Sequence, residues 1–314
     1  MEATVPSSPA PRNLSRYWLA TRPYAYTAAL VPVLIGTAAA RFLFPSLSVI
    51  WIHFALVLLG SIAIQAVSNV VNDYYDAKWG LDNPDNNGRM NALVSHLITF
   101  REAKGLIAFC AVIAGLIGLY FVSVVGGPIT GLLAVGVVLA IGYTAPPLKL
   151  KYRAMGDLAV IAGFGFGMSL GAYMVQAYGQ PAFLSLPALA KLAVYTLPSA
   201  LLVVAILHTN NHRDRGNDIE FGARTLGNVL SPQTSKGLLF GLLLMPYALV
   251  AVEVATGYGT PWWALVLLAV PPLGAVLKRV RADEFEGMLV PDVAKLHGIF
   301  GLLTALAICL AVLR

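Results

Sequence analysis

Charged residues are scarce in this chain of 314 residues. Asp, Glu, Lys and Arg together make up 11% of it, whereas soluble domains carry about 25%. Hydrophobic residues make up 58%, and the mean hydropathy is +0.75. This balance excludes an ordinary soluble domain and predicts an integral membrane protein.

Cysteine is almost absent as well. The two cysteines, Cys110 and Cys309, lie inside apolar stretches and have no metal-ligand spacing. Their placement excludes a disulfide framework and a zinc site and indicates packing residues. The apolar stretches also lack period-two alternation, which excludes a transmembrane barrel.

What the sequence has instead is a series of apolar stretches close to the ~20 residues that cross a bilayer. Pro and Gly mark most of their ends. We therefore predict an all-α fold, a multi-pass membrane helical bundle of about nine transmembrane helices. The nine predicted spans are Tyr24 to Phe42, Val49 to Val71, Gly105 to Val124, Ile129 to Ala145, Leu158 to Tyr178, Pro187 to His208, Gly237 to Thr256, Trp262 to Leu277 and Ala294 to Leu313.

The chain begins with a segment of different composition. Residues 1–20 are rich in Pro and Ser and contain no apolar stretch of signal-peptide type, so we expect a disordered tail that leads into an interfacial segment. Tyr17 and Trp18 are expected to anchor that segment among the lipid headgroups. Residues 21–314 are expected to form one transmembrane domain.

The net charge of +6 is explained by membrane topology. With nine spans, 18 of the 21 Lys and Arg residues fall on the side of the N-terminus, and only Arg41, Lys191 and Arg314 fall on the other. Because cytoplasmic loops carry the excess of Lys and Arg, we expect the N-terminus and the long loops in the cytoplasm, and the protein in the cell (inner or plasma) membrane. No nucleic-acid partner is predicted.

Two acidic motifs stand on that same side. If the helix of the second span continues to Asp76, then Asn69, Asp73 and Asp76 lie at i, i+4 and i+7 on one helical face. At the end of the sixth span, Asn211, Asp214 and Asp218 fall at i, i+3 and i+7. The sequence therefore predicts the same arrangement twice.

Stacked carboxylates repel one another, so each motif calls for a cation. Hard oxygen ligands without a His or Cys cluster favour magnesium, which takes one or two protein carboxylates and completes its shell from a phosphate. Two facing sites would hold a diphosphate between them, with Lys and Arg on its other oxygens. Either motif alone is more typical of a solvated helix end; the pair favours a functional site.

These residues resemble the UbiA superfamily of intramembrane prenyltransferases, and in particular the 1,4-dihydroxy-2-naphthoate polyprenyltransferases of menaquinone synthesis. The likeness rests on N-x-x-N-D-Y-x-D-x-x-x-G-x-D from Asn69 to Asp82, on N-N-x-R-D-x-x-x-D-x-x-x-G-x-R-T-L from Asn210 to Leu226, and on the loop from Tyr143 to Asp157. The stretch from Asn91 to Thr99 departs from the R-P-L-V-S-G-x-I pattern common in relatives, with Asn91-Ala92 for Arg-Pro and His96 for Gly. The departure leaves open the closure of this loop and the identity of the acceptor.

The resemblance implies Mg²⁺-dependent transfer of a polyprenyl group from its diphosphate to a small aromatic acceptor in the membrane. It implies magnesium ligation by Asp73, Asp76, Asp214 and Asp218. Catalytic roles are further implied for Lys149 and Tyr143, and substrate-binding roles for Arg22, Asn69, Asn72, Lys151, Arg153, Asn211 and Arg213.

Several of these residues have a simpler interpretation. Lys149, Lys151 and Arg153 also satisfy the positive-inside rule, Tyr143 also suits an interfacial anchor, and Arg22 also suits an anchor of the tail. Asp157 is interpreted as a helix N-cap, and His208 and His212 as polar neighbours of the second magnesium site, because no third zinc ligand follows them.

Two alternatives to the narrow assignment remain. A transporter would carry acids near the bilayer midplane, whereas all but one of the 15 carboxylates here, Glu253, stand on one side. The other alternative keeps prenyl transfer but changes the acceptor to another quinone precursor, a tetrapyrrole or a lipid alcohol.

Overall fold

The computed structural model describes residues 14–84 and 91–313, and this part of the chain is helical without a strand. Eight of its helical segments are long and apolar enough to cross a membrane. A shorter apolar helix, α5, stands where the fourth span is predicted. The predicted all-α membrane bundle is confirmed. The expected tail falls mostly in residues 1–13, outside the described residues, and Ser15–Ala20 form the short helix α1.

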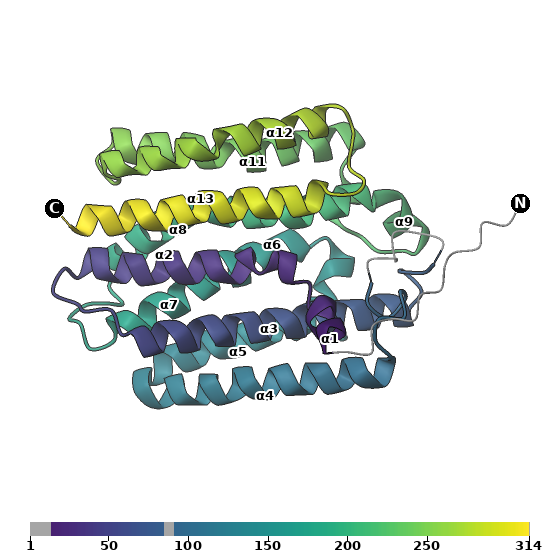
Figure 1. The fold of residues 1–314 in the computed structure, drawn as a ribbon, viewed down its shortest axis with the longest axis horizontal. Helices are drawn as coiled ribbons and strands as arrows, with labels where there is room; N and C mark the ends of the chain where they lie inside the picture. The colour runs from purple at the N-terminus through teal and green to yellow at the C-terminus, as the bar shows by residue number, and fades with distance from the viewer. Residues whose placement is uncertain (1–13, 85–90, 314) are drawn as a thin grey trace, which may run out of the picture.

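The long helices run side by side, roughly along the long axis of the molecule (Figure 1). They are α2 (Thr27–Leu43), α3 (Trp51–Lys78), α4 (Phe100–Val125), α5 (Gly127–Gly142), α7 (Met168–Ala177), α8 (Leu186–Arg213), α11 (Pro232–Ala255), α12 (Val270–Arg281) and α13 (Leu289–Val312). Shorter segments are η1 (Pro23–Ala25), η3 (Leu150–Arg153), α6 (Gly156–Val160), η4 (Ile161–Gly167), α9 (Arg215–Glu220), α10 (Leu226–Val229) and η5 (Pro261–Ala269). Of these, α6 and η4 continue into α7 as one span, and η5 continues into α12 as another.

Small residues allow the central helices to approach closely. A Cβ atom at Gly36 of α2 would lie 2.1 Å from the carbonyl oxygen of Ser169 in α7, and one at Gly301 of α13 would lie 2.2 Å from Val31. Apolar packing between helices gives no hydrophobic gain within lipid, so close backbone contact and dispersion hold such a bundle together. Helix α2 accordingly packs between α7 and α13.

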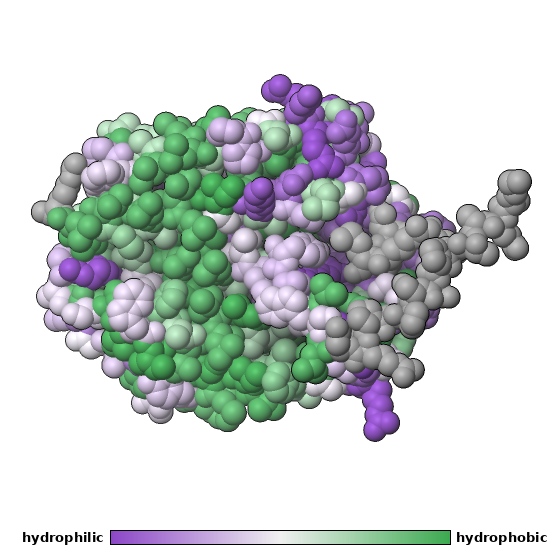
Figure 2. Space-filling model, in the orientation of Figure 1, coloured by the Kyte–Doolittle hydropathy of each residue, from purple (hydrophilic) through white to green (hydrophobic). Residues whose placement is uncertain are grey.

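The two ends of the bundle differ in polarity. Figure 2 shows an apolar band over most of the visible face and hydrophilic residues gathered at the end that carries α1 and α9. The loop between α12 and α13 lies at that end too, with Lys236 bound to Asp283 at 2.7 Å. The polar end therefore collects the loops on the side predicted to be cytoplasmic.

The helix boundaries support one prediction about the acidic motifs and correct another. Helix α3 continues to Lys78, so Asn69, Asp73 and Asp76 do share one helix. The second motif does not, because α8 ends at Arg213, Asp214 caps it with φ −86° and ψ 4°, and Asp218 belongs to α9. The run of Asp, Gly and Asn that follows Arg213 consists of poor helix formers, which accounts for the break.

Candidate active site

The carboxylate of Asp76, at the polar end of α3, is buried and fully engaged. Its side chain is 1% exposed. Lys151 donates to Oδ2 at 2.5 Å, Asn72 donates to Oδ2 at 2.8 Å and the Tyr152 hydroxyl donates to Oδ1 at 2.6 Å. Charge-assisted bonds of this kind hold the carboxylate in one orientation.

Asp73 lies one turn earlier on α3 and is equally buried. The Arg22 guanidinium donates to Oδ1, and the backbone N–H of Ala92 donates to Oδ2 at 2.9 Å. Arg22 adopts the left-handed conformation, with φ 56°, at the start of η1. Ala92 explains part of the departure noted in the sequence, because a proline at this position would have no N–H to give.

Asn91 ties the loop after the first motif to that motif. Its Nδ2 donates at 2.9 Å both to Oδ2 of Asp82 and to the carbonyl oxygen of Asp73. Its Oδ1 accepts from the N–H of Leu93 at 2.9 Å. The residue is 1% exposed, so a neutral buried amide fixes this loop against the acidic site.

The loop from Tyr143 to Arg153 brings one lysine to the site and turns another away. Lys149 adopts the left-handed conformation, and its Nζ lies 4.0 Å from the centre of the Trp79 ring, a cation–π contact. Lys151 reaches Asp76, whereas Arg153 donates to the carbonyl oxygen of Pro147 at 3.2 Å. Of the three predicted basic residues in this loop, the structure places only Lys151 among the acids.

The second motif forms its own network at the end of α8. Arg213 Nε donates to Oδ1 of Asp214 at 2.7 Å, and Asn210 donates to Oδ2 of Asp214 at 3.1 Å. Asp218 is 3% exposed and accepts from the Thr225 hydroxyl at 3.1 Å. Both carboxylates thus lie at the same end of the bundle as the first motif.

Asn side chains of both motifs line one cavity, whereas the four motif carboxylates do not line it. Asp73, Asp76 and Asp214 lie behind the lining and are bonded by residues of it. Asn217 of α9 donates to the carbonyl oxygen of Leu81 at 2.9 Å, which joins the two motif loops. A cavity of roughly 150 Å³ lies between α3 and α8. Its polar lining comes from Arg22, Tyr24, Gln65, Ser68, Asn69, Asn72, Tyr143, Lys151, Asn210 and Asn211.

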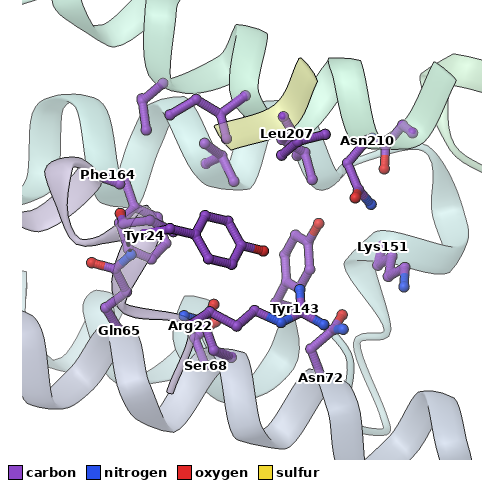
Figure 3. A pocket seen from close by; sticks show the side chains of 18 residues that line it. Arg22, Tyr24, Gln65, Ser68, Asn72, Tyr143, Lys151, Phe164, Leu207 and Asn210 are labelled. Carbon is purple, nitrogen blue, oxygen red and sulfur yellow. Dashed lines mark hydrogen bonds between the residues drawn. The ribbon is translucent and has the colours of Figure 1, made fainter. Parts of the chain in front are cut away.

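Figure 3 shows how these side chains are arranged. Gln65, Ser68 and Asn72 come from one helix, Leu207 and Asn210 from the helix opposite, and the rings of Tyr24 and Tyr143 lie between them. The remaining lining is apolar and consists of Ala25, Ala28, Val160, Phe164, Val203, Ile206, Leu207 and Val290. The cavity therefore offers amides and cations toward the acids and hydrocarbon elsewhere.

Burial shapes the electrostatics of the groups that stand outside the spans. Burial raises the pKa of Asp218 to about 6, although the positive charge of Lys151 lowers it. For Arg22 and Lys151 burial lowers the pKa, but nearby carboxylates outweigh it and the net shift is upward. Both cations thus stay charged, and the site contains fixed positive charge beside its acids.

The donors present fit magnesium better than zinc. Among the described residues no group of three or more His, Cys, Asp or Glu side chains is arranged to hold a metal by itself. Magnesium needs no such cage, since one or two carboxylates with water and phosphate oxygens satisfy it. Carboxylate and amide oxygens, the donor types that magnesium prefers, are present in both motifs.

The interpretation of Asp157 as an N-cap is wrong. Met155 occupies the cap position of α6 without a side-chain bond, and the Asp157 carboxylate lies 3.2 Å from Nδ1 of His208. The other nitrogen of His208 lies 3.1 Å from the Ser235 hydroxyl, which also contacts His212 at 2.8 Å. The two histidines form a buried polar network behind α8, between α6 and α11.

Comparison with known proteins decides the family, because the model of the UbiA prenyltransferase family matches residues 29–286. The chain belongs to the UbiA prenyltransferase family. The 1,4-dihydroxy-2-naphthoate octaprenyltransferase of Bacillus subtilis is 29% identical over 300 residues, which cover 95% of this chain and 93% of that protein. UbiA prenyltransferase domain-containing protein 1 of Xenopus tropicalis is 31% identical over 302 residues, covering 96% and 83%.

Solved UbiA homologues share the fold. One from Aeropyrum pernix K1 superposes with a TM-score of 0.69 at 13% identity, covering 91% of this chain and 97% of that one. One from Archaeoglobus fulgidus, bound to GPP and Mg²⁺, gives a TM-score of 0.60 at 14% identity, covering 94% and 99%. The predicted membership of the UbiA superfamily is confirmed, and the family's prenyltransferase activity favours an enzyme over a transporter.

Sequence reasoning missed several residues that build the site. Tyr152 binds Asp76, Asn91 binds Asp82, and Tyr24, Gln65 and Ser68 line the cavity. Only the last two had a signal in the sequence, since Gln65 and Ser68 are polar residues in an apolar span and lie at i−4 and i−1 from Asn69.

Proposed function

We propose that this protein transfers a polyprenyl group from its diphosphate to 1,4-dihydroxy-2-naphthoate, with Mg²⁺ as cofactor. One observation carries the proposal: Asn side chains of two acidic motifs from distant parts of the chain line one cavity, together with the two cations that bond Asp73 and Asp76, and much of the remaining lining is apolar. An amphiphilic substrate with an anionic head and a hydrocarbon tail matches that division.

Asp73 and Asp76 of the first motif and Asp214 and Asp218 of the second would hold magnesium. Asn69, Asn72 and Asn211, which line the cavity, would serve as amide ligands or as donors that orient the carboxylates. When bound, the metal would neutralise charge that develops on the departing diphosphate. The existing contacts of Arg22 and Lys151 with these carboxylates position both cations for the same oxygens.

The hydrocarbon side of the cavity excludes water from the reacting carbon. Val203, Leu207 and Phe164 line it, and the rings of Tyr24 and Tyr143 border it. A buried, dry site protects an allylic cation from hydrolysis, and aromatic faces stabilise positive charge. The aromatic acceptor then forms the new carbon–carbon bond, and its carboxyl group leaves as carbon dioxide.

The choice of naphthoate as the acceptor is supported by the similarity to the Bacillus subtilis protein, whose name gives 1,4-dihydroxy-2-naphthoate as its substrate. The test is incubation of purified protein with Mg²⁺, a prenyl diphosphate and a panel of acceptors, followed by mass spectrometry. A prenylated, decarboxylated naphthalenediol, with no product from 4-hydroxybenzoate, is the expected result. If product formed only with another acceptor, the protein would be a prenyltransferase of the same family that acts on that acceptor.

We further propose that the polar end faces the cytoplasm. The excess of Lys and Arg on the side of the N-terminus supports this orientation, as does the gathering of hydrophilic residues at the end that carries α1 and α9 (Figure 2). At such a site the diphosphate head of the prenyl substrate and the carboxylate of the acceptor would face the cytoplasm, while the isoprenoid tail stays in the bilayer.

A further inference from the structure

Gln65 is a buried polar residue that the acidic site does not use. It lies in the middle of α3, is 2% exposed and lines the cavity. Its Nε2 donates to the carbonyl oxygen of Ala25 at 2.8 Å, while its Oε1 is buried and accepts no hydrogen bond from the residues that the structure describes. A buried acceptor without a donor is costly, and a ligand that brings a donor would satisfy it.

Gln65 begins a polar stripe on the cavity face of α3. Gln65, Ser68, Asn69 and Asn72 follow one another at i, i+3, i+4 and i+7, and all four line the cavity. The lining from η4 and α8 is apolar at Phe164, Val203 and Leu207 and becomes polar only at Asn210 and Asn211, near the end of α8. Figure 3 shows Gln65 and Ser68 on one side of the cavity and Leu207 on the other.

Chemistry excludes the diphosphate as the partner of Gln65. The oxygens of an ionised diphosphate only accept hydrogen bonds, and Oε1 of Gln65 is itself an acceptor. Asp76 also lies eleven positions further along α3, which is about 16 Å at 1.5 Å per residue. An isoprenoid chain reaches that far, but it is a hydrocarbon and has no hydrogen to donate to Oε1. A hydroxyl group on the acceptor ring is the donor that remains.

We propose that Gln65, with Ser68 one turn nearer the acids, accepts a hydrogen bond from a ring hydroxyl of the aromatic acceptor. The part of α3 at Gln65 and Ser68 is then the acceptor wall of the cavity, and the apolar side chains of η4 and α8 form the wall for the isoprenoid. The inference rests on the proposed prenyl transfer and adds to it a residue that selects hydroxylated rings. Sites that bond a substrate hydroxyl reject analogues that lack it.

The test compares substrates that differ by one hydroxyl. Turnover is measured with 1,4-dihydroxy-2-naphthoate and with the two monohydroxy-2-naphthoates that each lack one hydroxyl, in the wild-type protein and in Gln65→Met. Met keeps the size of Gln and removes its acceptor. Because the intrinsic reactivities of the substrates cancel between proteins, the ratio of kcat/KM values isolates the contact.

We expect the preference for the dihydroxy acid over one of the two analogues to fall about tenfold in Gln65→Met, while KM for the prenyl diphosphate changes less than twofold. Ser68→Ala, which removes only a hydroxyl, should lower the same preference about threefold and carries the test if Gln65→Met does not fold.

Gln176→Met is the matched control. Gln176 is also 2% exposed, but it bonds the backbone of Ile50 and does not line the cavity, so the preference should stay at the wild-type value. An unchanged preference in both Gln65→Met and Ser68→Ala would overturn the inference, as would an effect on the KM for the prenyl diphosphate alone. Absence of prenyl transfer to any hydroxylated ring by the wild-type protein would instead contradict the proposed function.

Discussion

At the scale of single residues, the site depends on which cation reaches which carboxylate. Lys149 and Lys151 are two positions apart, yet Lys149 lies over Trp79 and only Lys151 bonds Asp76 and lines the cavity. The sequence placed both on one loop without distinguishing them, because the left-handed backbone at Lys149 that separates their directions follows from the folded loop and not from the residue type.

This difference gives a paired prediction. Lys151→Met should lower kcat/KM for the prenyl diphosphate about 10- to 100-fold, because a charge-assisted bond to the diphosphate is lost. Lys149→Met should change it less than twofold. Steady-state kinetics at saturating acceptor measure both values. Equal losses in the two variants would place the diphosphate against the loop as a whole and not at Lys151.

The buried carboxylate of Asp218 gives a pH prediction. Burial raises its pKa to about 6, so protons compete with a metal there as the pH falls through 6, and the carboxylate is ionised and available above it. Binding of Mn²⁺, a spectroscopic substitute for Mg²⁺, should weaken roughly tenfold per pH unit below 6. Asp218→Asn should bind Mn²⁺ more weakly and lose most of that dependence; a wild-type affinity that stays flat down to pH 5 would contradict the assignment.

At the scale of elements, the first motif is predictable and the second only in part. Asn69, Asp73 and Asp76 continue an apolar span without a break, so helical spacing alone places them on one helix. The second motif crosses the end of α8 at Asp214, and its geometry depends on α9 and α10 folding back against that end. Such tertiary contacts leave no periodic signal in the sequence, and the same holds for the pairing of Asp157 with His208.

Packing of α10 on α8 can be tested at one glycine. A Cβ atom at Gly227 would lie 2.2 Å from the carbonyl oxygen of Asn211, so Gly227→Ala must push α10 away from the second motif. We expect a destabilisation of about 1–3 kcal/mol and a clear loss of turnover, measured by thermal unfolding in detergent and by activity. Gly237→Ala is the control, since a Cβ there meets nothing within 4 Å. Wild-type behaviour of Gly227→Ala would show that α10 does not support the motif.

At the scale of the whole molecule, composition alone predicts a helical membrane protein. The nine predicted apolar segments correspond to eight segments long enough to cross a membrane and to the shorter helix α5. The fourth span is the least regular, because α5 has only 16 residues. The depth at which each side chain lies within the cavity could not be predicted from the sequence, because it depends on which helices face each other. Gln65 and Ser68 acquire a role only once α3 lies across from α8.

Orientation is the prediction that belongs to this scale. A cysteine introduced as Asp283→Cys, at the polar end, should be protected from an impermeant maleimide in intact cells, and one introduced as Gly257→Cys, between α11 and η5, should be labelled. Asp283 is exposed and Gly257 stands at the opposite end of α11 from Lys236. The reverse labelling pattern would place the active site outside the cytoplasm.

The most direct test of joint action by the two motifs is the rate of prenyl transfer in a double-mutant cycle of Asp76→Asn and Asp218→Asn, with Mg²⁺ and with excess chelator. Because both carboxylates serve one site, the turnover of each single variant should fall at least about 100-fold. The turnover of the double variant should be only slightly lower than that of the less active single variant. Chelation should stop the wild-type reaction. Wild-type turnover in either single variant, or full activity in chelator, would contradict a shared magnesium–diphosphate site between α3 and α8.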